Sequence, residues 1–147
     1  MNKLARAIGK GIVAGIAGTA AMTVSSLVEA KLRKRAFSKA PAKAAEKALG
    51  IDRFRSDRDE ARFSDLVHWG YGTGWGVVRG FLREFGLGPK LSTPAHFVAV
   101  WGSALVSLPA LDVAPPGTMW EREEVLVDVF HHLVYATAVA VAYERLS

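Results

Sequence analysis

Cysteine is absent from the 147-residue chain. Its absence excludes disulfide bonds and thiolate zinc sites, so any bound metal would need histidine and carboxylate ligands. Charged residues make up only 22% of the chain, whereas hydrophobic residues make up 50%. These proportions exclude an extended disordered chain, and the length fits one domain over residues 1–147.

The sequence also lacks the common motifs of catalysis and nucleotide binding. It has no Gly-x-Ser-x-Gly elbow, no His-Glu-x-x-His sequence and no Walker loop. The nearest approach to a dinucleotide-binding fingerprint, Gly9, Gly11 and Ala14, does not follow a sequence that predicts a strand. We therefore expect no enzyme activity and no cofactor.

Apolar residues are gathered into four blocks, which explains a mean hydropathy of +0.17 in a chain with 19 Lys and Arg. The first block has eighteen uncharged residues from Gly11 to Val28, which is bilayer length. A secretory signal peptide is one alternative for this block, because basic residues precede it. For the whole chain, a peripheral protein whose apolar hairpins rest on the membrane is an alternative. We expect an all-α integral membrane four-helix bundle, with spans near 9–30, 63–83, 93–111 and 122–143.

Positive charge is concentrated in residues 31–62, which contain eleven Lys or Arg against five Asp or Glu. Only two aromatic residues, Phe37 and Phe54, interrupt this segment, too few for the base stacking of a nucleic-acid site. The positive-inside rule instead predicts a cytoplasmic loop, with both chain termini outside. Within the loop, Pro41 and Gly50 bound a short amphipathic helix that we expect on the membrane surface.

Glycines recur at helical spacing in the first two blocks. His68, Gly72, Gly76 and Gly80 follow one another every four residues and so share one helix face. Small residues on such a face let helix backbones approach closely in a bilayer, as in a glycine zipper. With Gly11 and Gly15, the chain has two such faces, which predicts a homo-oligomer or a partner membrane subunit.

Proline and capping residues mark the ends of the last two blocks. Thr93 and Pro94 predict the start of the third helix, and Pro109 predicts a kink or an end near Leu108. Thr118 and Glu121 are spaced as a capping box for the fourth helix. Trp120 and Tyr143 stand at the ends of this helix, as interfacial aromatic residues do.

Ionisable residues are rare inside the blocks and are predicted to form a layer near the cytoplasmic ends of the helices. The candidates for this layer are Glu29, Asp65, His68, Asp128, His131 and His132. Two Asp-x-x-His pairs on facing helices would supply metal ligands, and the same groups would also suit a proton or ion path. Interhelical hydrogen bonding is the structural alternative. We expect Arg79 to extend to the outer interface beside Arg83.

Three segments in this order, HWGYGTGWGVVRG, W101 with LPALDVAPP, and EEVLVDVFHHLVYATAVAVAYE, resemble the YagU-type family of small bacterial inner-membrane proteins. The resemblance covers residues 63–144 and maps the family positions to His68, Gly72, Gly76, Pro109 and one of His131 or His132. Asp112 stands where the family pattern has a small residue such as Gly. The resemblance implies an inner-membrane location and no defined chemistry.

These observations favour a structural or accessory membrane subunit that is surrounded by lipid and packs through its glycine faces. The alternative is a small transporter, or a membrane factor linked to protons or metal ions, that uses the Asp and His layer. Substitution distinguishes the two, because the first depends on the glycines and the second on the histidines.

Overall fold

The computed structural model describes residues 2–147, and the helices account for most of them. In chain order the helices are α1 (Lys3–Leu32), α2 (Ala40–Leu49), α3 (Asp57–Glu84), α4 (Pro89–Ala110), a 3-10 turn (Gly117–Met119) and α5 (Arg122–Arg145). No strand occurs among these residues, which confirms an all-α chain.

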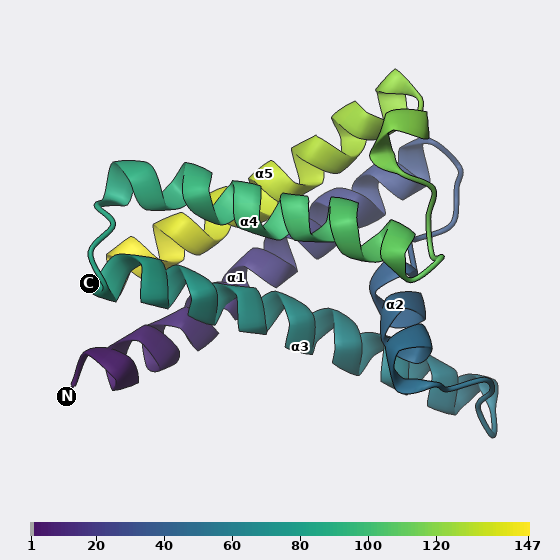
Figure 1. Ribbon diagram of the computed structural model, residues 1–147, viewed down its shortest axis with the longest axis horizontal. Helices are drawn as coiled ribbons and strands as arrows, with labels where there is room; N and C mark the ends of the chain where they lie inside the picture. The colour runs from purple at the N-terminus through teal and green to yellow at the C-terminus, as the bar shows by residue number, and fades with distance from the viewer. Residues whose placement is uncertain (1) are drawn as a thin grey trace.

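The four long helices alternate in direction along the molecule (Figure 1). α1 and α4 run from the end that holds both chain termini toward the end that holds α2, and α3 and α5 run back. α1 contacts α3 and α5, and α4 contacts α5 and α3, so the helices close into a bundle. The chain therefore reverses direction between successive long helices.

Side chains at the helix starts explain where the helices begin. Asn2 Oδ1 accepts a hydrogen bond from the Ala5 amide of α1 at 2.8 Å, and Ser56 Oγ accepts one from the Asp59 amide of α3 at 3.2 Å. The first turn of α3 also carries three acidic side chains, which suit the positive end of the helix dipole.

Two predicted helix starts are wrong. α5 is capped by Glu121 with Glu124, while Thr118 lies in the 3-10 turn that precedes the helix. α4 begins at Pro89, not at Thr93, because the Gly88-Pro89 pair already provides an extended residue followed by a proline in the first turn. Pro94 is consequently inside the helix. The predicted end near Leu108 is close to the observed end at Ala110.

Within the described residues 2–147, three helices are long and apolar enough to span a membrane: α1, α4 and α5. The expected fourth span, near 63–83, lies within α3 but is not among them, so a bundle of four spanning helices is not confirmed. The mean hydropathy of α3 falls because its apolar part contains five glycines between Gly70 and Gly80 together with His68 and Arg79. The short helix expected between Pro41 and Gly50 is present as α2.

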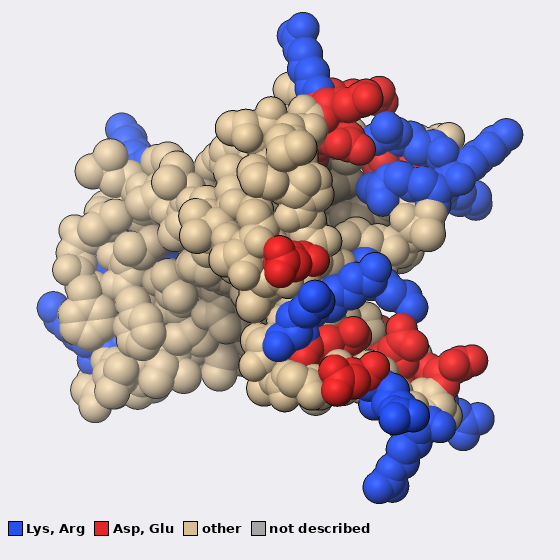
Figure 2. All heavy atoms as spheres, turned by 45° about the vertical axis from the view of Figure 1, so that its right-hand side comes forward, with Lys and Arg blue, Asp and Glu red and all other residues tan. Residues whose placement is uncertain are grey.

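The bundle has a small core and an apolar exterior. Ala14, Val100, Tyr135, Val139 and Tyr143 form the buried cluster. Large apolar side chains are instead exposed along the outer faces, including Ile12, Val24, Val98, Val106, Leu126 and Phe130. Figure 2 shows charged side chains gathered toward the α2 end, with an almost uncharged surface over much of the rest of this face. This distribution fits a membrane protein.

Candidate functional site

The glycines of α1 and α3 meet each other at the crossing of the two helices. A Cβ atom added at Gly11 would lie 2.6 Å from the Cα atom of Val77, and one added at Gly76 would lie 2.5 Å from the amide nitrogen of Gly15. A Cβ atom at Gly80 would lie 2.7 Å from the carbonyl carbon of Ala7. These neighbours are backbone atoms that cannot move aside, so the crossing requires glycine.

Gly72 belongs to the same face of α3 and meets the Thr19 side chain of α1. The Gly72 carbonyl also accepts a hydrogen bond of 2.5 Å from the buried Tyr135 hydroxyl of α5. The two glycine faces therefore pair within one chain. The oligomer was predicted from two glycine faces that lacked a partner, and this reason for it no longer applies. The oligomer itself stays a prediction.

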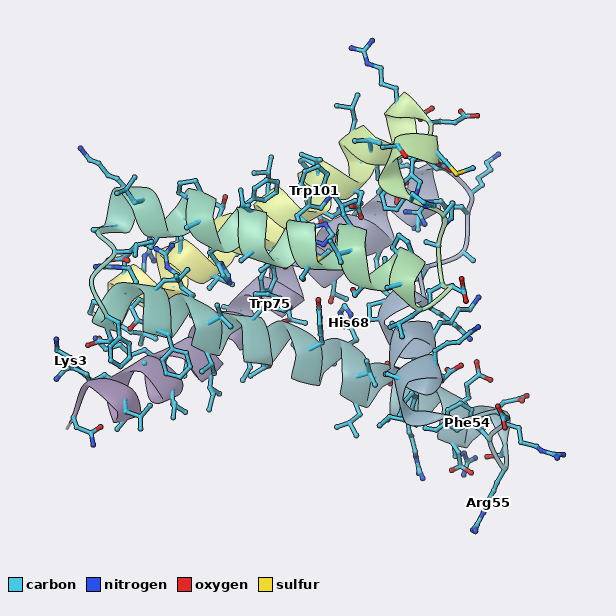
Figure 3. The ribbon with its side chains drawn as sticks, viewed as in Figure 1. Lys3, Phe54, Arg55, His68, Trp75 and Trp101 are labelled. Atoms are coloured by element: carbon cyan, nitrogen blue, oxygen red, sulfur yellow. The ribbon has the colours of Figure 1, made fainter. Side chains whose placement is uncertain are left out.

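The predicted polar layer separates into local pairs at the α2 end of the bundle. His68 lies 2.7 Å from Thr23 of α1 through its Nε2 atom, and it points from α3 into the bundle (Figure 3). The Thr23 hydroxyl in turn bonds the Thr19 carbonyl at 2.7 Å. His68 thus joins α3 to α1 one turn beyond the glycine crossing.

His131 joins α5 to α1. Its Nδ1 atom lies 2.8 Å from the Ser25 hydroxyl, and its Nε2 atom lies 3.7 Å from a carboxylate oxygen of Glu29. Glu29 is also held by Arg33 and Arg35, which follow the last turns of α1. Arg33 reaches Glu123 at the start of α5 with a distance of 3.1 Å. His131 and Glu29 are therefore the one His and carboxylate pair of the predicted layer that bridges two helices, among the residues that the structure describes.

Asp128 and His132 form a third group on α5. The Trp101 indole of α4 donates a 2.8 Å hydrogen bond to Asp128 Oδ2, and Trp101 is labelled in Figure 3. His132 Nδ1 lies 2.8 Å from the Asp128 carbonyl oxygen, within its own helix turn. Asp65 is exposed. Within residues 2–147, no three His, Asp or Glu side chains are grouped as metal ligands, so the facing Asp-x-x-His pairs do not converge on one ion.

A charged cluster at the opposite end was not predicted. Arg79 is fully buried, and its guanidinium donates to Thr93 at 3.0 Å and to Glu144 at 3.2 Å. Arg83 holds the same Glu144 carboxylate by two hydrogen bonds of 2.6 and 3.0 Å. The expectation that Arg79 extends to the outer interface is wrong, because Glu144 provides a partner inside the bundle.

A second carboxylate extends this cluster to the start of α1. Glu84 accepts hydrogen bonds from Arg6 at 3.1 Å and from the Tyr143 hydroxyl at 3.2 Å. The first turn of α1 and the last turns of α3 and α5 are thereby tied together. The sequence signal for this cluster is Arg79 within an apolar block, since intramembrane charges usually have a partner, while Glu144 lies directly after the fourth block.

His96 is fully buried on α4 and lies outside the predicted layer. Its Nε2 atom lies 2.9 Å from the Trp75 carbonyl oxygen of α3. Because a carbonyl oxygen only accepts hydrogen bonds, Nε2 carries the proton and donates it. His96 therefore fastens α4 to α3 near the middle of the bundle.

Comparison of the chain with known protein families, with curated proteins and with solved structures gives no match in any of the three. The resemblance to the YagU-type family stays a prediction. The functional argument therefore rests on the geometry.

Proposed function

We propose that the protein is a small membrane protein of four crossing helices that acts as a structural or accessory subunit. One observation carries the proposal: polar side chains of the bundle form hydrogen bonds and ion pairs between helices. His68, His96, His131, Asp128 and Glu144 each contact another helix, while the large apolar side chains face outward. The same residues supply no catalytic constellation, so we propose no enzyme activity, no cofactor and no nucleic-acid partner.

The alternation of the helices supports a fourth span in α3. α1 ends at the α2 end of the bundle, whereas α4 starts at the other end (Figure 1). If α1 and α4 both cross the bilayer, the chain between them must cross it as well. The 28 residues of α3 extend about 42 Å, more than the roughly 30 Å of a hydrocarbon core. Contact with α1 shields Gly72, Gly76 and Gly80 of α3 from lipid, and the buried Arg79 is paired with α4 and α5.

The positive charge of residues 31–62 supports a cytoplasmic location for the α2 end. Both termini and the loop between α3 and α4 would then lie on the outer side of the inner membrane. In this arrangement α2, with Lys39 directly before it and Lys43 and Lys47 within it, lies at the cytoplasmic surface, where Lys and Arg are attracted to anionic lipid.

Labelling of single cysteines tests this topology directly, because the native chain has none. Ser38→Cys, Leu87→Cys, Pro116→Cys and Ser147→Cys place one thiol in each connection between successive long helices and one at the C-terminus. A membrane-impermeant maleimide should label positions 38 and 116 from the cytoplasmic side, and positions 87 and 147 from the opposite side. Labelling of positions 38 and 87 from the same side would contradict a span in α3, and extraction by carbonate would contradict integral insertion.

A proton- or ion-linked membrane factor is the second candidate function. The observation in its favour is His131 Nε2, a buried atom with no hydrogen-bond partner in the described part of the chain. It faces Glu29 at 3.7 Å, so a proton shared by the pair would bridge α5 and α1. We propose this pair in place of the larger layer of Asp and His residues.

The homo-oligomer, or a complex with another membrane subunit, is also kept as a proposal. It now rests on the apolar outer faces, because the glycines are paired within the chain. The mass of the particle in a mild detergent tests it: a multiple of 15.8 kDa, or a stoichiometric second subunit, is expected, and a monomer would contradict it.

A further inference from the structure

The end of the bundle that holds the termini carries a groove between the start of α4 and the end of α5. Its volume is about 500 Å³, and its lining includes Arg79, Lys90, Thr93, Val141, Glu144 and Arg145. We call it the arginine groove. It belongs to neither the glycine crossing nor the histidine pairs.

The arginine groove has more positive than negative charge. Three cations and one carboxylate line it, and that carboxylate, Glu144, is already bonded to Arg79 and Arg83. Lys90 and Arg145 are exposed, and neither pairs with a carboxylate within residues 2–147. The groove therefore attracts an anion that the chain itself does not supply.

Two further features point to an anionic ligand. Arg79 has no exposed surface, yet its Nε atom has no hydrogen-bond partner in the part of the chain that the structure describes. The first turn of α4 also lines the groove and has no acidic residue and no side-chain cap. The positive end of the α4 dipole is thus left without a counter-charge, as at sites where helix N-termini bind phosphate groups.

A second groove indicates that the ligand also has an apolar part. It lies between α1 and α5, is lined by residues such as Ala17, Phe130, Leu133 and Thr137, and has a volume of about 790 Å³. This apolar groove shares Val141 and Arg145 with the arginine groove. The α5 residues from Phe130 to Arg145 cover about 22 Å of helix, which is the scale of a lipid acyl chain.

We propose that the arginine groove binds the phosphate group of an anionic phospholipid, with an acyl chain of the same lipid in the apolar groove. Lys90 and Arg145 hold the phosphate at the rim, beside the positive end of the α4 dipole. This rests on the membrane location proposed above and adds a specific lipid site to it.

The site can be tested with purified protein in mild detergent by native mass spectrometry. The probes are phosphatidylglycerol, phosphatidylcholine and inorganic phosphate, each added to protein from which lipid has been removed. The test variant is Lys90→Gln/Arg145→Gln, and Arg53→Gln/Arg55→Gln in the loop between α2 and α3 is its control, because it removes the same charge at the other end. Both variants change exposed side chains and should leave the fold intact.

We expect one phosphatidylglycerol to bind tightly to the wild-type protein and to the control, and about tenfold more weakly to Lys90→Gln/Arg145→Gln, since each interfacial cation adds to the attraction of anionic lipid. Inorganic phosphate should not displace it. Equal loss in both variants, or equal binding of phosphatidylcholine, would overturn the site. Binding of inorganic phosphate alone would overturn the lipid assignment. The cysteine labelling pattern is independent of these outcomes, so failure of the lipid site is distinguishable from failure of the proposed topology.

Discussion

At the residue scale, two glycines of α3 provide a matched pair for testing the α1 crossing. Gly76→Ala places a methyl group 2.5 Å from the Gly15 amide, whereas Gly74→Ala meets nothing within 4 Å. We expect Gly76→Ala to lower the free energy of unfolding by about 1 to 3 kcal/mol through overpacking. Gly74→Ala should be neutral or slightly stabilising, because alanine is the better helix former. Unfolding in mixed micelles measures both, and equal effects would contradict a close crossing.

A second residue-scale prediction concerns the end of α4. Asp112 has a φ of 52°, and the amides of Asp112 and Val113 bond the carbonyls of Pro109 and Leu108 at 3.0 and 2.9 Å. This is a Schellman motif, in which the left-handed residue is usually glycine. Asp112→Gly should therefore stabilise the protein by roughly 0.5 to 1 kcal/mol.

The corresponding position after α2 serves as the control for Asp112. Gly50 has a φ of 66° and ends α2 with the same pair of backbone hydrogen bonds. Gly50→Ala should destabilise by about 1 kcal/mol in the same unfolding measurement. A loss of stability in Asp112→Gly would show that the aspartate side chain contributes more than the backbone strain costs. The family resemblance predicts a small residue such as Gly at position 112. The positive φ at this position is a physical reason for it, because glycine adopts a positive φ without strain.

At the element scale, sequence pattern located the long helices but not all of their starts. The apolar blocks are long and bounded by charge, which is why α1, α3 and α5 were found. The predicted start of α4 is wrong because Thr93-Pro94 and Gly88-Pro89 are both acceptable start signals, and the helix begins at the earlier one. The polar layer was predicted as one site because helical spacing fixes the face and the level of a residue, but not the helix that it meets.

The arginine cluster shows why contacts between elements could not be predicted. Arg79 and Glu144 are 65 residues apart, and their ion pair depends on how α3 and α5 pack. We predict that Glu144→Gln, which leaves the buried Arg79 with a weaker partner, lowers stability by about 1 to 3 kcal/mol. Glu123→Gln makes the same change on α5 at an exposed pair and should cost less than about 0.5 kcal/mol. If Glu144→Gln and Glu123→Gln lowered the stability equally in thermal unfolding, the arginine cluster would not be an interaction that holds α3 and α5 together.

At the scale of the whole molecule, the two proposed functions differ in whether protons move through the bundle. His68 contacts Thr23, His131 contacts Ser25 and Glu29, and His132 contacts Asp128. Within residues 2–147, no hydrogen bond or ion pair joins one of these groups to the next. A proton relay needs successive groups within hydrogen-bond reach. The geometry therefore favours separate interhelical hydrogen bonds and ion pairs over a continuous path for protons.

This difference can be measured in liposomes that contain a pH-sensitive dye. Under an imposed pH gradient and a potassium diffusion potential, we expect liposomes with the wild-type protein to acidify no faster than empty liposomes. His131→Ala should leave this rate unchanged while lowering stability by roughly 1 to 3 kcal/mol, since it removes the bond to Ser25 and leaves a cavity beside Glu29. The contrary result is proton flux in the wild-type protein that is lost in His131→Ala and unchanged in Asp65→Asn, which alters an exposed residue. That result would establish the His131 and Glu29 pair as a proton site.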